Sequence, residues 1–162
     1  MKSLLRCVAA VIVGYLATAV AVFVTFTGAY LLMGTNAAFR EGSYDVSMLW
    51  IVTSIVLGFV AAVIGGALAR VIDPRRSTGP ALAGLILLLG VLSGSMALNR
   101  PDPGPRPPEV GNLEAMQRAK SPLWFTVLNP VVGIAGVLTG ARLAPRRKRF
   151  DDPTPGVQSH PG

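Results

Sequence analysis

Four long apolar blocks, separated by short polar segments, make up most of the chain. They cover about residues 7–33, 48–70, 80–98 and 122–143, and none has a charged residue or a histidine in its interior. At about 1.5 Å per residue, about 20 helical residues cross the roughly 30 Å hydrocarbon core of a bilayer. The pattern therefore predicts an all-α fold, in which residues 1–144 form an integral membrane bundle of four transmembrane helices.

The second block is the centre of the predicted bundle, because small residues recur along it at helical spacing. Rows of small residues let helix backbones approach closely, which is how helices associate in lipid, where burying apolar surface gains nothing. We therefore expect the second and fourth helices to pack tightly. The predicted helix-packing residues are Ser54, Gly58, Ala62 and Gly66, with Ala61, Gly65 and Ala69 as a second row beside them, then Gly90 and Gly94 in the third block and Gly133, Gly136 and Gly140 in the fourth.

Basic residues are distributed unevenly among the polar segments, and this predicts the orientation of the bundle. With four helices, both termini and the connection after the second block share one side. That side carries ten lysines and arginines, whereas the two connections on the opposite side carry five. The positive-inside rule then gives an N-in, C-in protein. On the outer side, Phe39 and Tyr44 are predicted to lie at headgroup level, where amphipathic rings are common.

The C-terminal segment, residues 145–162, is predicted to be a disordered basic cytoplasmic tail, because it has too little apolar surface to offset the entropy of ordering. Its basic cluster is a candidate site for anionic lipid, since each such residue near a membrane contributes about 1 kcal/mol of attraction. The alternative, which we favour, is that the cluster only anchors the topology. The cluster consists of Arg146, Arg147, Lys148 and Arg149.

The composition excludes an ordinary soluble globule. The chain is 51% hydrophobic and 14% charged, against about 25% charged residues in an average soluble domain. The net charge of +7 would suggest nucleic acid in a soluble protein, but here the charges flank apolar blocks. The expected partner is the lipid bilayer, and no nucleic acid is expected. Abundant Ala, Gly, Arg and Val suggest a GC-rich bacterial genome, hence a multi-pass protein of the bacterial cytoplasmic membrane.

The second and fourth blocks resemble one another at an offset of 74 residues. Their matching positions are Ser47, Leu49 and Trp50 with Ser121, Leu123 and Trp124, then Ala61, Val63, Gly66 and Ala67 with Ala135, Val137, Gly140 and Ala141. A duplication would give a repeated helical hairpin, related by an axis along the membrane normal. The alternative is convergence, because interfacial tryptophans and small packing residues are ordinary requirements of membrane helices.

A polar notch interrupts the fourth block at Thr126, Asn129 and Pro130. Proline removes a backbone donor and clashes with the carbonyl four residues earlier, so a kink is expected. The Asn129 amide can hydrogen-bond a neighbouring helix, for roughly 0.6 to 2 kcal/mol. The notch either joins a kinked helix to its neighbour, which we favour, or lines a small pore or ligand cleft.

The candidate chemistry is sparse. One cysteine and one histidine leave almost no metal ligands, so no metal and no cofactor are expected. The chain has no phosphate-binding loop and no nucleophile elbow. Ionisable groups inside membrane helices usually mark proton or substrate paths, and their absence argues against proton-coupled transport and against an enzyme. A membrane enzyme would have to use the loop carboxylates Glu41, Asp45 or Glu114.

Two known families of four-span proteins share the size of this chain. The small multidrug transporters depend on a glutamate in their first span, and residues 8–33 contain none. The stretch from Gly65 and Gly66 to Arg70 resembles the Gly-Gly…Arg stretch of the four-span fluoride channels, as does Thr25-Phe26-Thr27 their polar–aromatic track. The spacing after the glycines differs, and the stretch lies in another span. Neither resemblance carries a function to this chain.

The sequence thus predicts a small polytopic membrane protein with a non-catalytic role. We expect an accessory or packing subunit that associates with other membrane subunits or with itself. The alternative is a small channel or uncoupled transporter built around the polar notch at Asn129.

Overall fold

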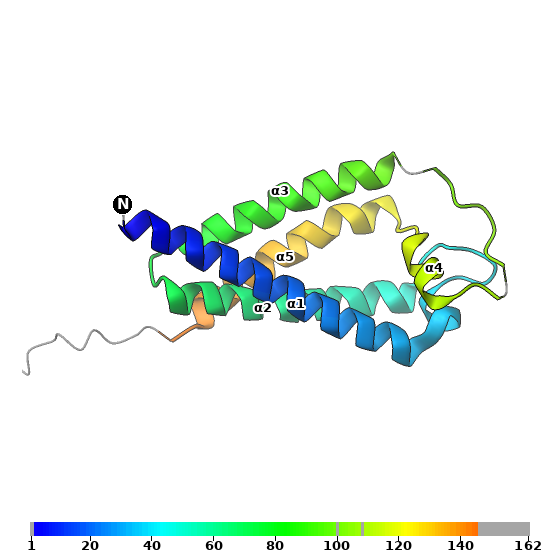
Figure 1. The fold of residues 1–162 in the computed structure, drawn as a ribbon, viewed down its shortest axis with the longest axis horizontal. Helices are drawn as coiled ribbons and strands as arrows, with labels where there is room; N and C mark the ends of the chain where they lie inside the picture. Colours follow the sequence, from blue (N-terminus) through cyan, green and yellow to red (C-terminus); the bar gives the residue numbers. More distant parts are fainter. Residues whose placement is uncertain (1, 100, 108, 146–162) are drawn as a thin grey trace, which may run out of the picture.

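A computed structural model of the chain is all-helical in the residues that it describes, which are 2–99, 101–107 and 109–145 (Figure 1). The helices are α1 (Lys2–Ala38), α2 (Met48–Ile72), α3 (Thr78–Leu98), α4 (Asn112–Gln117) and α5 (Leu123–Leu143). All except α4 are long and apolar enough to cross a membrane. The predicted all-α fold with four apolar spans is confirmed.

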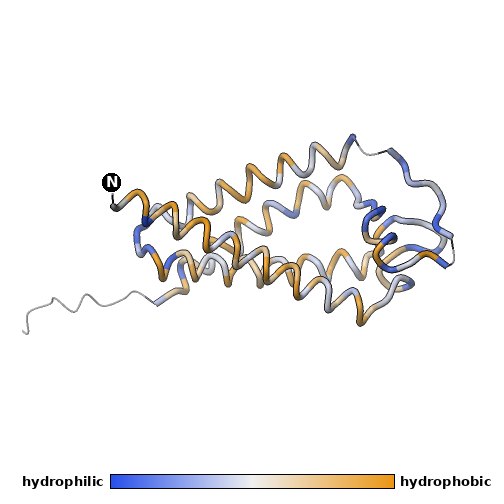
Figure 2. The backbone as a smooth tube through the Cα atoms, in the orientation of Figure 1, coloured by the Kyte–Doolittle hydropathy of each residue, from blue (hydrophilic) through white to orange (hydrophobic). Residues whose placement is uncertain are grey.

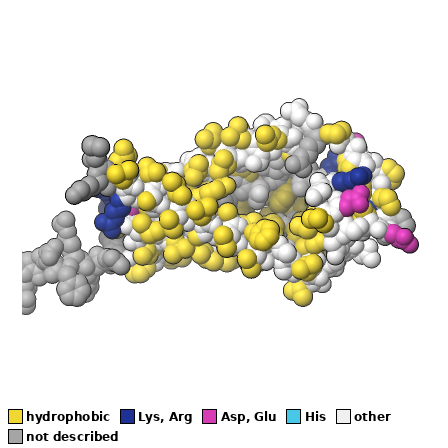
Figure 3. Space-filling model, viewed as in Figure 1, with side chains coloured by type: hydrophobic (Ala, Val, Ile, Leu, Met, Phe, Trp, Pro, Cys, Tyr) yellow, Lys and Arg dark blue, Asp and Glu magenta, His cyan; other side chains and the backbone are white. Residues whose placement is uncertain are grey.

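Apolar residues predominate along the four long helices (Figure 2), many of their large apolar side chains are exposed, and the face of the molecule seen in Figure 3 is largely apolar. Leu16, Phe23, Val56 and Leu88 are each more than half exposed. In water, a continuous apolar surface of this kind promotes association. In a bilayer it faces acyl chains of the same polarity, so the fold is compatible with a multi-pass membrane protein.

The first helix extends beyond the predicted apolar block at both ends. Near its C-terminal end, Gly34 interrupts the regular helix with φ 70° and ψ 171°. Glycine adopts this left-handed backbone without the steric penalty of a Cβ atom. The regular apolar part of α1 therefore stops just before Gly34, and the short turn after it leads into the connection to α2.

The second helix is the most deeply buried of the four long helices, and its contact with α5 is the most extensive in the bundle. It also packs against α1, while α3 packs against α5. Among the described residues, α1 makes no contact with α5. The four helices therefore run in the order α1, α2, α5, α3 around the bundle, and the tight α2–α5 pair predicted from the rows of small residues lies at its centre.

The α2–α5 interface repeats itself at the 74-residue offset. A Cβ atom on Gly66 would collide with the carbonyl of Val137, and one on Gly140 would collide with the carbonyl of Val63. Adding 74 to the residue numbers in α2 turns Val63 into Val137 and Gly66 into Gly140. Each of the two contacts therefore joins the same pair of corresponding positions, with the roles of the two helices reversed. Two parallel helices related by a pseudo-two-fold axis meet in this way. The structure thus contains a two-fold pattern at this interface, while a duplication as its origin stays a prediction.

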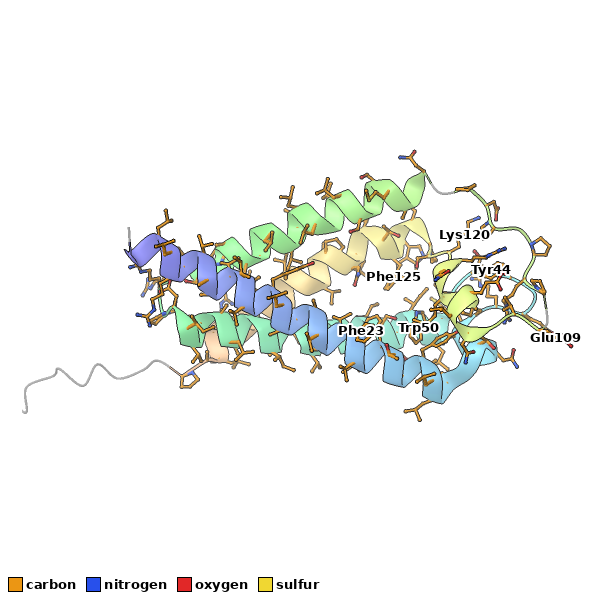
Figure 4. All side chains as sticks on the ribbon, in the orientation of Figure 1. Phe23, Tyr44, Trp50, Glu109, Lys120 and Phe125 are labelled. Atoms are coloured by element: carbon orange, nitrogen blue, oxygen red, sulfur yellow. The ribbon has the colours of Figure 1, made fainter. Side chains whose placement is uncertain are left out.

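One end of the bundle, which we call the capped end, is covered by α4 and by the connections before and after it. A compact cluster of side chains lies beneath this cover and includes Tyr30, Phe39, Val46, Ile51 and Phe125. The connection between α1 and α2 also belongs to this cover. Backbone hydrogen bonds tie it to the segment after α4, from Lys120 N to Tyr44 O at 2.9 Å and from Val46 N to Lys120 O at 3.1 Å. Tyr44, Trp50 and Lys120 gather at this end (Figure 4).

Phe39 and Tyr44, for which the sequence predicts the headgroup level, are enclosed by protein at the capped end. Their exposed fractions are 4% and 1%, because the connections fold over the helix ends and enclose both rings. Arg106 lies over the Phe39 ring at 5.7 Å and Arg118 over the Tyr44 ring at 5.9 Å. These rings hold the cap together instead of anchoring it in the membrane surface.

The opposite end, which we call the basic end, contains the start of α1 and the turn between α2 and α3. Arg6 Nε donates a hydrogen bond to Ile72 O at 2.9 Å and so ties α1 to the end of α2. In the turn, the buried Asp73 carboxylate accepts a hydrogen bond from Thr78 Oγ1 at 3.2 Å and pairs with Arg75 at 3.6 Å. Among the described residues, this end holds six of the ten basic residues counted for it, namely Lys2, Arg6, Arg70, Arg75, Arg76 and Arg142.

The orientation can be tested with reporter fusions. We expect a phosphatase reporter, active only outside the cytoplasm, to be active after Glu109 and inactive after Arg75. A fluorescent protein that folds only in the cytoplasm should show the reverse pattern. Activity of one reporter at both positions would contradict the four-span topology, because the capped and basic ends would then share one side.

Candidate binding cleft

A lateral cleft is the main hollow of the described structure. The first and third helices meet near the basic end, where a Cβ atom on Gly14 would lie 2.9 Å from Leu82 Cδ2, and they separate toward the capped end (Figure 1). Between them opens a cleft of about 1520 Å³, lined by all four long helices. Figure 3 shows the face onto which it opens, hollowed between two apolar ridges.

The helical walls of the cleft are about half as long as the hydrocarbon core of a membrane is thick. Its lining comes from residues 15–26 of α1, 86–97 of α3 and 123–133 of α5. At about 1.5 Å per residue, these segments are about 15 to 17 Å long. The hydrocarbon core of a bilayer is about 30 Å thick, so one leaflet occupies about 15 Å of it. The helical walls of the cleft are therefore about as long as one leaflet of the hydrocarbon core is thick.

Toward the basic end the cleft is closed by direct backbone packing. Gly65 of α2 lies against Gly14 and Thr18 of α1, so closely that a Cβ atom there would collide with both. On the other side of α2, Gly66 meets the Val137 carbonyl of α5. These contacts are made by backbone atoms and the short Thr18 side chain, and the cleft lining on α2 ends before them, at Ala62.

All three residues of the predicted polar notch line the cleft. Thr126 Oγ1 donates to the Pro122 carbonyl at 3.3 Å and is therefore satisfied on its own helix. The Pro130 ring packs against Gly90 of α3, where a Cβ atom would lie 2.5 Å from Pro130 Cγ. The Asn129 side chain is exposed in the cleft and makes no hydrogen bond to any residue that the structure describes. Its amide is thus free to bind another molecule.

The predicted packing residues divide into two groups. Ala62, Gly66, Gly136 and Gly140 lie in the α2–α5 interface, and Gly90, Gly94 and Gly133 lie between α3 and α5. Gly58 belongs to the same row but faces the cleft, because the nearest atoms to its Cβ position, in Asn129 and Phe26, are 4.0 Å away. Ser54 is buried, and its hydroxyl has no hydrogen-bond partner among the described residues.

Charged residues surround the mouth of the cleft at the capped end (Figure 3). Lys120 Nζ binds Asp102 at 3.1 Å, and this hydrogen bond holds the pKa of the Asp102 carboxyl below its usual value. Arg118 pairs with Glu114 at 3.1 Å. Arg40 and Asp45 also line the mouth, and neither side chain forms an ion pair within the described part of the chain. One positive and one negative group are therefore available there.

Comparison with protein-family models, with curated proteins and with solved structures gives no match.

The carboxylates considered for an enzyme are not gathered in the cleft. Only Asp45 lines it; Glu41 lies on the exposed connection, and Glu114 belongs to α4, where Arg118 binds it. Among the described residues, no three His, Cys, Asp or Glu side chains are grouped so that they could hold a metal ion. The predicted lipid-binding cluster of Arg146, Arg147, Lys148 and Arg149 lies outside the described residues.

Two features of the structure were missed in reasoning from the sequence. The first is that Arg40 and Asp45 line the cleft mouth without an ion pair in the described part of the chain. This depends on how the connections fold, and the spacing of the two residues along the chain does not indicate it. Asp73 is 1% exposed although it lies in a polar turn. Its partners Arg75 and Thr78 follow within five residues, so a carboxylate closely followed by basic and hydroxyl residues at a helix start is the signal that identifies it.

Proposed function

We propose that the protein is a non-catalytic accessory protein of the bacterial cytoplasmic membrane that acts by binding, with the lateral cleft as its binding site. The observation that carries this proposal is that the cleft is open to the side of the bundle and closed toward the basic end. Its walls are mostly apolar, and its few polar groups are hydroxyls, an amide and the charges of the mouth. Such a site suits an apolar membrane component better than a reaction.

The proposal predicts that a molecule occupies the cleft in the membrane. A photo-cross-linking amino acid at Ser93, which lines the cleft, should give a covalent adduct with a membrane component on illumination. The matched control is Ser95 of the same helix, which is also exposed but does not line the cleft. We expect at least several times more adduct at position 93, measured by mass spectrometry of the purified protein. Equal yields at the two positions would contradict binding in the cleft.

An uncoupled transporter is the second candidate, and the unpartnered Asn129 amide favours it. A transporter would have to open the packed half of the bundle, where Gly65 and Gly66 touch their neighbours. We therefore expect liposomes containing the protein to show only background flux of small ions and solutes. Flux above background that Asn129→Leu abolishes, in a variant that still folds, would favour the transporter over the binding protein.

A further inference from the structure

We infer that the cleft holds a single phospholipid from the leaflet at the capped end, with a phosphoethanolamine headgroup at the mouth. This inference rests on the proposed function and names the occupant of the same site. Three observations carry it: the length of the cleft, the position of its polar wall and the two available charges at its mouth.

The length of the cleft distinguishes a lipid from a partner helix. A transmembrane helix needs about 30 Å of hydrophobic length, whereas the cleft is about 15 to 17 Å deep by helical rise. Its far end is closed by close packing around Gly14 and Gly65, and Pro101 and Pro103 line it at the capped end. A partner helix would collide with both ends. The acyl chains of one leaflet fit this depth.

The walls of the cleft match the two parts of a lipid molecule. Ile86 supplies apolar surface deeper in the cleft than Asn129, because it lies against Gly133, about one turn further along α5. Asn129 lies six residues beyond the start of α5, which is about 9 Å by helical rise. The headgroup region adds about 5 to 8 Å on each side of the hydrocarbon core. Asn129 also lies beside Gly58, ten residues along α2, which is about 15 Å by helical rise. A lipid drawn into the cleft by this distance would bring an ester carbonyl within reach of the Asn129 amide, which could donate a hydrogen bond to it.

The charges at the mouth indicate the headgroup. Arg40 and Asp45 line the cleft without an ion pair in the described part of the chain, while Lys120 is bound to Asp102. A phosphate is the natural partner of a guanidinium, and an ammonium group is the natural partner of a carboxylate. Phosphoethanolamine carries both groups a few ångströms apart. A phosphoglycerol headgroup would satisfy Arg40 and leave Asp45 without a cation.

The test uses the purified full-length chain, stripped of lipid in detergent and then exposed to micelles with equal amounts of phosphatidylethanolamine and phosphatidylglycerol. Native mass spectrometry should show one retained lipid, with phosphatidylethanolamine preferred about fivefold, as expected from one additional exposed ion pair. Ser93→Trp fills the cleft and should reduce retention at least fivefold. Ser95→Trp, the matched control outside the cleft, should leave retention unchanged.

The headgroup assignment has its own pair of variants. Asp45→Asn should reduce the preference between the two lipids to about one, because the ammonium loses its partner while the phosphate keeps Arg40. Glu41→Gln removes a neighbouring exposed carboxylate that does not line the cleft, and it should leave the preference unchanged. Melting temperatures of all variants, measured by circular dichroism, separate loss of binding from loss of folding.

The failures of the two proposals can be distinguished. Equal lipid retention in Ser93→Trp and Ser95→Trp would mean that only surface lipid is bound, and the inference would be overturned. A polypeptide adduct at Ser93 without lipid retention would also overturn it, while leaving the proposed binding function in place. Folded protein with no adduct at Ser93 would remove the proposed function as well.

Discussion

Replacing Gly140 by alanine is expected to destabilise the bundle, whereas the same replacement at Gly84 is not. A Cβ atom on Gly140 would collide with the Val63 carbonyl and would lie 2.9 Å from the backbone nitrogen of Ala67. These are backbone atoms, so no side-chain rotation can relieve the collision, and α2 and α5 must move apart. Overpacking of this kind reduces the free energy of unfolding by about 1 to 3 kcal/mol, and sometimes by more.

Gly84 provides a matched control, since it lies within α3 and its Cβ position has no atom within 4 Å. Alanine is a better helix former than glycine by about 1 kcal/mol. Gly84→Ala should therefore leave the melting temperature unchanged or raise it slightly, while Gly140→Ala should lower it by several degrees. Thermal unfolding of both variants in the same detergent, followed by circular dichroism, measures the difference.

The two-fold pattern of the interface extends the same prediction to Gly66. Its Cβ position meets the Val137 carbonyl in the way that Gly140 meets the Val63 carbonyl. Gly66→Ala and Gly140→Ala should therefore have similar effects. Melting temperatures of Gly66→Ala and Gly140→Ala as high as that of Gly84→Ala would mean that the two helices are not in backbone contact.

The central helix pair was predictable because its determinants are local in the sequence. An apolar block of about twenty residues has few alternatives to a membrane helix, since an unpaired backbone is costly in lipid. Rows of small residues then identify the faces that pack. Gly66, Gly136 and Gly140 illustrate this, since each lies in a row with a four-residue spacing and meets a backbone in the structure.

The cleft was not predictable, because it depends on how helices distant in the sequence diverge. Gly58 belongs to the same row as Gly66, yet it lines the cleft beside Asn129 instead of meeting a helix backbone. Gly58 and Gly66 differ because α1 and α3 separate toward the capped end. No sequence pattern within α2 indicates this separation. The polar notch at Asn129 was visible in the sequence, but whether its amide meets a neighbouring helix or a cavity depends on that same divergence.

The burial of Phe39 and Tyr44 in the cap was not predictable for a related reason. Aromatic residues in a loop next to a membrane helix usually lie at headgroup level, but here the loop folds back over the helix ends. Tyr30 of α1 donates a hydrogen bond to the Asn112 carbonyl at 3.2 Å, across 82 residues of chain. A cluster of such long-range contacts turns Phe39 and Tyr44 into core residues, which neighbouring sequence alone does not indicate.

Replacing Phe125 by alanine is the second change with a large expected effect. Phe125 is 8% exposed and packs with Tyr30, Phe39 and Val46 beneath the cap. Removal of a buried phenylalanine ring leaves a cavity and typically lowers the free energy of unfolding by about 3 to 5 kcal/mol. We therefore expect a lower melting temperature, together with faster hydrogen exchange in residues 109–120, whose cover over the helix ends depends on this cluster.

Phe23→Ala is the matched control for this prediction. Phe23 carries the same side chain but is 72% exposed on α1, so its removal exchanges contacts with lipid or detergent and leaves no cavity within the protein. Its effect on the melting temperature should be small, because surface substitutions usually change stability by less than about 0.5 kcal/mol. If the two variants melt at the same temperature, the cap is not packed on Phe125. If only Phe125→Ala melts early while hydrogen exchange in the cap is unchanged, the ring stabilises the ends of α2 and α5 and not the cap above them.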